Sequence, residues 1–248
     1  MYNPEFHTNQ NGVPIISGAD LDIIGERLVF DFSPDLMCAP REIDIDRFVI
    51  NYLGMKQDFF YLSHCGVYLG MTVFLDSNTI PVYIPELNQA EYASAKARTV
   101  IIDQSLMEDD QEHRYRFTMG HEGSHGILHT PYFLSDVGRG IPYSQEYSKF
   151  IRCRADNYRF DIHSPSTRWT DAKRIEWQAN RLSSAILMPK CMVSMLMAQM
   201  PNRGEVDRTR SISENVSEVF NVSLEAAFYR LKDLGYLDKD LGFQDVFS

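Results

Sequence analysis

The 248-residue sequence contains no run of 18 consecutive apolar residues and no cysteine pair in C-x-x-C spacing. The first absence argues against a membrane-spanning helix, and the second argues against a cysteine zinc site. The four cysteines are far apart in the chain, so we expect free thiols. The first 20 residues lack a basic start followed by an apolar run, which argues against a secretory signal peptide. We therefore expect a cytoplasmic protein.

Basic residues are also scarce. The chain has 24 Lys and Arg against 34 Asp and Glu, which gives a formal net charge of −10. This excess argues against binding of nucleic acid or of an anionic membrane by the chain as a whole, although it leaves a local basic face open. Hydrophobic residues make up 44% of the chain, enough for a sizeable core. The composition indicates an acidic globular protein.

The most informative feature that is present is His121-Glu122-Gly123-Ser124-His125. In a helix, positions 121 and 125 lie roughly 40° apart around the axis and about 6 Å apart along it, so both imidazoles can reach one zinc ion. Glu122 points to the adjoining face, where it can act as a general base without binding the metal. The pattern predicts a hydrolytic Zn²⁺ site with His121 and His125 as ligands and Glu122 as the catalytic residue.

A catalytic zinc site needs a third protein ligand. His129 continues the series, but it lies about 12 Å along the helix axis from His121, which disfavours it as a ligand. The sequence leaves three roles possible for His129: packing in the core, a position at the rim of the site, or a contact with a metal ligand or the substrate. Position 131 is Pro, which excludes a three-histidine site of the metzincin kind.

Glu176 is the preferred third ligand. It stands four residues before Asn180 on a predicted helix, so one of them can bind zinc while the other accepts the free N–H of a ligating imidazole. The spacing alone also allows an alternative in which Glu176 is exposed and forms an ion pair with Lys173 or Arg181.

Hydrophobic spacing and turn residues predict the elements around this motif. Strands are expected within 59–84 and at 99–103, with a connector between them from about residue 87. Residues 131–169 have no clear hydrophobic periodicity, which favours an extended segment that passes over the site. Helices are expected at about 19–32, 44–53, 110–129, 170–188, 192–200, 211–220 and 224–234.

Two segments, RFTMGHEGSHGILH at 116–129 and EWQANRLSSAILMP at 176–189, resemble the ImmA/IrrE family of zinc metallopeptidases. That family's motifs read approximately R-F-T-x-x-H-E-x-G-H-x-x-x-H and E-x-x-A-N-x-F-A-x-x-L-L-M-P. With similar features upstream and near the C-terminus, the resemblance covers about residues 18–237. It implies a gluzincin-like site in which His121, His125 and Glu176 bind zinc and Glu122 is the base.

The sequence departs from the family pattern at two places. Gly123-Ser124 stands where the family usually has an apolar residue and glycine, and Leu182-Ser183 stands where it usually has Phe-Ala. Neither departure replaces a proposed ligand or the base. The two departures affect the expected packing and substrate fit more than the expected metal binding.

The expected fold class is α+β. We predict a loose leader at 1–17, a zincin-like metallopeptidase domain at 18–200 and a small helical extension at 201–248. In the central domain, a small antiparallel sheet packs on the active-site helices. The three glycines of the motif helix are expected to let another backbone approach closely, with a strand of the sheet as the candidate.

The expected function is zinc-dependent hydrolysis of a peptide bond in a protein substrate. The resemblance suggests a repressor-type transcription regulator as substrate, linked to a mobile element or a stress response. The main alternative is a non-catalytic zinc-containing protein that binds and sequesters a partner. A third, DNA-binding alternative rests on 211–234, which resembles a helix-turn-helix. The basic residues near it are Arg208, Arg210, Arg230 and Lys232, but neighbouring acidic residues favour packing. A membrane is not an expected partner, and the oligomeric state is open.

In the expected mechanism, Glu122 takes a proton from water and later delivers it to the leaving amine. His163 or a tyrosine within 131–169 is a candidate donor to the oxyanion. Substrate could pair as an added strand along Tyr68–Phe74, although the same run also reads as a core strand.

Overall fold

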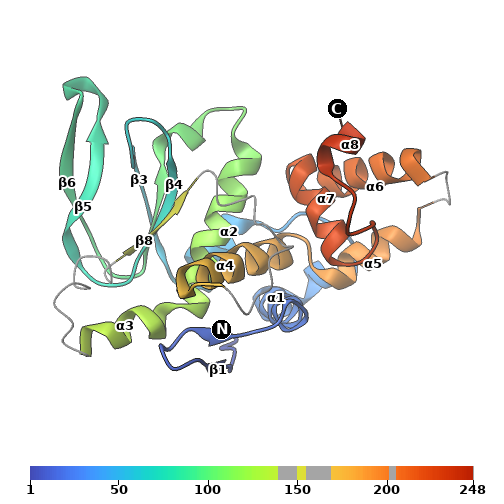
Figure 1. Ribbon diagram of the computed structural model, residues 1–248, viewed down its shortest axis with the longest axis horizontal. Helices are drawn as coiled ribbons and strands as arrows, with labels where there is room; N and C mark the ends of the chain where they lie inside the picture. Colours follow the sequence, from blue (N-terminus) through green and yellow to red (C-terminus); the bar gives the residue numbers. More distant parts are fainter. Residues whose placement is uncertain (139–149, 155–168, 201–204, 248) are drawn as a thin grey trace.

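The structure is a computed structural model that describes residues 1–138, 150–154, 169–200 and 205–247. Figure 1 shows the two larger sheets at one side, α2 and α4 in the middle and the C-terminal helices at the other side. The fold class is α+β, as predicted. None of the helices in these ranges is both long and apolar enough to cross a membrane.

A four-stranded sheet has the order β3-β7-β4-β8. Its strands are β3 (Lys56–Phe60), β4 (Tyr68–Val73), β7 (Thr99–Asp103) and β8 (Phe150–Arg154). β4 is antiparallel to both β7 and β8, but β3 is parallel to β7. The prediction of a small antiparallel sheet holds for β4 with β7 and β8. β3 departs from it, because the long connection between β3 and β7 returns the chain in the same direction.

A separate hairpin of β5 (Ser77–Ile84) and β6 (Gln89–Ala95) extends beside this sheet (Figure 1). An isolated bridge between Tyr61 and Tyr83 links it to the rest of the chain. β6 lies where a connector was expected, since its exposed polar residues hide the strand pattern.

The N-terminal leader is not loose. β1 (His7–Thr8) pairs with β2 (Pro14–Ile15), and the side chains of Asn9 and Asn11 donate hydrogen bonds to Asp171 at the start of α4. These contacts fix residues that have no hydrophobic periodicity, which is why the sequence did not indicate them.

Helix α1 (Gly18–Phe32) begins at a capping box, in which Ser17 and Asp20 each bond the other's backbone N–H. The helix expected at 44–53 contains a π-helical turn at Arg47–Tyr52, and Leu53 is its C-cap. Gly54 follows the cap with a φ of +66°, which favours glycine.

The remaining α-helices lie near the predicted positions with three exceptions. α6 begins at Glu205, before the predicted start at 211. α3 was not predicted within the polar 131–169 segment, and neither was α8 near the C-terminus. The α-helices that follow α1 in the described residues are α2 (Glu112–Leu128), α3 (Thr130–Gly138), α4 (Asp171–Leu187), α5 (Lys190–Ala198), α6 (Glu205–Phe220), α7 (Leu224–Asp233) and α8 (Phe243–Phe247).

One buried apolar cluster runs from α1 through α2 and α4 to the C-terminal helices, and it includes Leu21, Met119, Ile186 and Phe228. The C-terminal helices therefore share a core with the helices that carry the motif. The division at residue 200 remains a proposal.

Charged side chains within this core join three helices. Asp22 on α1 accepts hydrogen bonds from Arg181 on α4 (2.8 Å) and from Arg230 on α7 (2.5 Å). Arg230 and Lys232 are both buried, and the Lys232 ammonium donates to the carbonyl of Leu241. These two cations are not available to DNA phosphates, so they do not support the DNA-binding alternative.

Candidate functional site

Helix α2 carries the motif through the middle of the molecule, between β4 and α4, and His121, Glu122 and His125 are fully buried. Its glycines do allow close contacts, but not with a strand as predicted. A Cβ at Gly120 would lie 2.5 Å from Ser183 Oγ on α4, and one at Gly123 would lie 2.9 Å from Val49.

The strand approaches α2 through its own glycine. A Cβ at Gly70 on β4 would lie 2.6 Å from Glu122 Oε1. The absence of a side chain at this position therefore makes room for the Glu122 carboxylate.

The two motif histidines point their Nε2 atoms at the same space, 2.9 Å apart. Glu176 of α4 places Oε2 3.5 Å from His121 Nε2 and Oε1 3.6 Å from His125 Nε2. Because zinc binds imidazole nitrogen and carboxylate oxygen at about 2.0–2.2 Å, one ion can be held by all three groups. The side chains of His121, His125 and Glu176 therefore fit a zinc ion in both chemistry and spacing.

The outer nitrogen of His121 is also bonded. His121 Nδ1 lies 2.7 Å from Asn180 Oδ1, so Asn180 accepts the imidazole N–H and leaves Nε2 directed at the metal position. This is the contact predicted from the spacing of Glu176 and Asn180.

The outer nitrogen of His125 begins a chain of hydrogen bonds that the sequence did not reveal. His125 Nδ1 lies 2.9 Å from His129 Nδ1, and His129 Nε2 lies 3.0 Å from Gln178 Oε1. Gln178 in turn donates to the Pro14 carbonyl at 2.7 Å. His129 is fully buried, so of the alternatives left open for it, the structure favours contact with a proposed ligand over a place at the rim.

The electrostatics separate the two motif histidines. Burial and the neighbouring His121 hold the pKa of His125 well below its usual range. Burial also acts to lower the pKa of His121, but Cys153 and Glu176 outweigh burial and raise it.

The Glu122 carboxylate lies beside this cluster. Thr72 Oγ1 on β4 donates to Glu122 Oε2 at 2.5 Å, whereas Oε1 is buried without a hydrogen-bond partner in the described part of the chain. Burial raises the pKa of Glu122 to about 8, against the opposing effects of His121 and Thr72. A carboxylate poised in this range suits proton transfer. Thr72 lies in an ordinary strand pattern, from which this contact with Glu122 cannot be predicted.

Cys153 was also not predicted as part of the site. The ligand atoms of His121, Glu122 and Cys153 all lie within 4.8 Å of one another, and the thiol is fully buried. A single cysteine without a C-x-x-C partner gives no recognisable sequence signal.

The other predicted features of the site have different outcomes. His163 and the tyrosines at 139–149 and 155–168 lie outside the described residues. The edge of β4 proposed for substrate pairs with β8 in this structure. A substrate peptide cannot pair with this edge of β4 while β8 is paired there.

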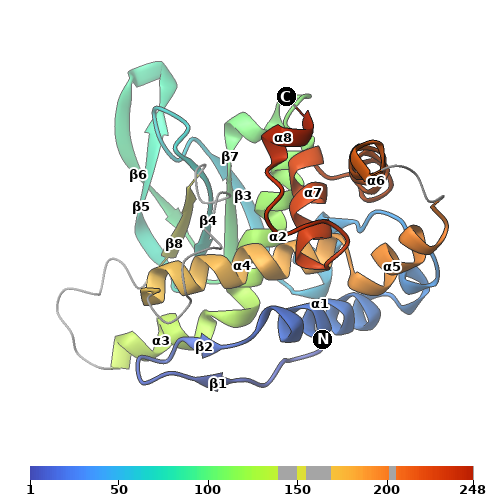
Figure 2. The ribbon, with the colours of Figure 1, turned by 45° about the vertical axis from the view of Figure 1, so that its right-hand side comes forward.

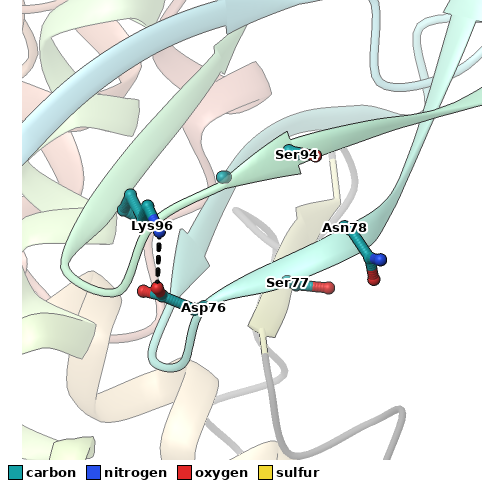
Figure 3. Close-up of a pocket in the computed structure, with 6 residues that line it drawn as sticks. Asp76, Ser77, Asn78, Ser94 and Lys96 are labelled. Atoms are coloured by element: carbon teal, nitrogen blue, oxygen red, sulfur yellow. Dashed lines mark hydrogen bonds and ion pairs between the residues drawn. The ribbon is translucent and has the colours of Figure 1, made fainter.

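A separate pocket lies at the base of the β5–β6 hairpin (Figure 3). Asp76 and Lys96 form an exposed ion pair of 2.9 Å beside it. The pocket contains none of the histidine-cluster residues, and we do not assign it to the site. Its lining residues are Asp76, Ser77, Asn78, Ser94, Ala95 and Lys96.

Residues 152–232 match the peptidase M78 family model, described as an IrrE N-terminal-like domain. The match confirms the resemblance to the ImmA/IrrE family and indicates a metallopeptidase. It includes Cys153, Glu176 and Asn180, whereas the motif at 121–125 precedes it. A search of curated proteins finds no match to the chain.

Proposed function

We propose that this chain, which matches an IrrE-type peptidase family, is a zinc-dependent endopeptidase. The convergence of His121, His125 and Glu176 on one space, with the Glu122 carboxylate beside it, is the observation that supports the proposal most strongly. The ligands would be the two imidazoles and the Glu176 carboxylate.

When bound, zinc would supply Lewis acidity that makes a water molecule easier to deprotonate and polarises the carbonyl of the scissile peptide bond. Glu122 would accept the proton of that water at its carboxylate and then deliver it to the nitrogen of the leaving amine. Thr72 holds Oε2 of Glu122, so Oε1 is the oxygen left for the proton. Asn180 and His129 hold the imidazoles of His121 and His125 in orientation.

The proposed substrate is a protein, and the family resemblance favours a repressor-type transcription regulator. A cytoplasmic location would place the enzyme with such a regulator. Cleavage would then relieve repression, as in a response linked to a mobile element or to stress.

The test compares wild-type protein with Glu122→Gln, which removes the proton acceptor but none of the proposed ligands. The exposed Glu86→Gln is the matched control. New protein N-termini are mapped by mass spectrometry in cells that produce each form, and zinc is measured in each purified protein. We expect cleavage products with wild type and Glu86→Gln, and none with Glu122→Gln despite retained zinc. Equal biological output from wild type and Glu122→Gln, without cleavage, would support the sequestering alternative instead.

A further inference from the structure

Strand β8 lies along one edge of β4 (Figure 2). The register pairs Gly70 with Cys153 and Thr72 with Ile151. Gly70 and Thr72 are the two β4 residues that contact Glu122. A peptide that added to this edge would need the position that β8 holds.

The register also explains where Cys153 points. Residues directly opposite each other in an antiparallel pair lie on the same face of the sheet. Since the Gly70 position faces Glu122, Cys153 faces α2 as well, and its ligand atom comes within 4.8 Å of those of His121 and Glu122. His121 belongs both to this group and to the group with His125 and Glu176. His121 is the residue that the two groups share, so the thiol lies on the side of the proposed metal position that faces His121 and Glu122.

A second observation points into the same space. Glu122 Oε1 is fully buried and has no hydrogen-bond partner in the described part of the chain. A reacting water must lie within reach of both the metal and this carboxylate. The Cys153 thiol, near His121 and Glu122, stands on that side of the site. His121, Glu122, His125 and Cys153 are fully shielded from solvent, so a peptide has no access to them in this conformation.

We infer that Cys153 is a further metal ligand, which takes the place of the reacting water, and that β8 holds the place of a substrate strand on β4. The inference rests on the proposed zinc site. Thiolate sulfur is a common zinc ligand, and the thiol proton is released to solvent when sulfur binds the metal. The described conformation is then self-inhibited, and cleavage requires β8 to leave the edge of β4.

Cobalt substitution tests the ligand directly. Thiolate bound to Co²⁺ gives an intense near-ultraviolet charge-transfer band, which nitrogen and oxygen ligands do not give. The full chain is loaded with one equivalent of Co²⁺ as wild type, Cys153→Ser and Cys153→Ala, with the exposed Cys38→Ser as the matched control. We expect the band in wild type and Cys38→Ser, and its loss in both Cys153 variants while cobalt stays bound.

The two possible failures can be told apart. Wild-type protein that binds cobalt, loses it on Glu176→Ala and shows no thiolate band would overturn the role of Cys153 but leave the metal site standing. Wild-type protein that binds no cobalt or zinc would overturn the metal site and this inference together. The wild-type spectrum alone shows whether a thiolate binds the metal, even if a Cys153 variant fails to fold.

Hydrogen exchange tests the position of the strand. If Cys153 binds the metal, metal addition should slow amide exchange in residues 150–154 by at least about tenfold in wild type, since local opening must then break the metal bond. The same addition should have little effect on these residues in Cys153→Ser. Exchange in β8 of wild type that does not respond to bound metal would contradict the proposed link between strand and site.

Discussion

His125 and His129 bring their Nδ1 atoms within 2.9 Å of each other. If His125 Nε2 binds the metal, its Nδ1 carries the proton and donates to His129, whose Nε2–H then donates to Gln178. One tautomer of each ring satisfies every bond in the chain. His129, the C-cap residue of α2, therefore orients a ligand without itself reaching the metal.

This chain of bonds predicts an effect on metal affinity. His129→Ala should weaken zinc binding by about 10–100-fold, because His125 loses the acceptor that fixes its ring. The exposed His64→Ala should leave zinc affinity unchanged. A competition titration against a chromophoric chelator measures both. Equal affinity in His129→Ala and wild type would show that His129 only packs.

Thr72 should affect the reaction without affecting the metal. Thr72→Val keeps the side-chain shape but removes the hydroxyl that donates to Glu122 Oε2. A hydrogen bond to a charged group contributes about 1.5–3 kcal/mol, so kcat/KM should fall roughly 10–100-fold. Zinc content should stay at the wild-type value. Loss of zinc in this variant would mean that Thr72 supports the ligands rather than the base.

Gly70 should not accept a side chain. The added Cβ of Gly70→Ala would lie 2.6 Å from Glu122 Oε1, so the variant should lose about 1–3 kcal/mol of unfolding free energy. Gly18→Ala is the matched control, because its Cβ would meet its nearest neighbour at 3.6 Å, an ordinary contact distance. Urea denaturation measures both. Equal midpoints for the two variants would show that Glu122 yields to the added methyl group.

The charged cluster around Asp22 should be important for stability. Arg230→Ala leaves the buried Asp22 carboxylate with one guanidinium partner fewer, and removal of one member of a buried ion pair costs about 3–5 kcal/mol. Lys96→Ala, which removes an exposed ion pair, should leave the denaturation midpoint close to that of wild type. A small effect of Arg230→Ala would mean that the cluster does not tie α7 to α1.

The sequence predicted the parts of the fold that depend on local signals. The apolar stripe and capping residues of α1, and the Pro189 that follows α4, placed these helices to within about two residues. The spacing of Glu176 and Asn180 also predicted that one of them accepts the free N–H of a ligating imidazole, and Asn180 is placed to do so at His121.

The missed features depend on contacts between distant segments. β8 has no alternating pattern, and it is a strand because β4 offers an unpaired edge. Thr72, Gln178 and Cys153 gain their places beside the motif from the register of strands and the packing of helices. Neither register nor packing can be read from local sequence.

The measurement that tests the central claim most directly is the metal content of the purified protein after removal of loosely bound ions. Wild type is compared with His125→Ala and Glu176→Ala, with Glu86→Ala as the control and circular dichroism as the check on folding. We predict about one zinc per chain in wild type and Glu86→Ala, and loss of zinc in the other two while the fold persists. Wild-type protein without zinc after repletion, or zinc retained in both ligand variants, would contradict the proposed site.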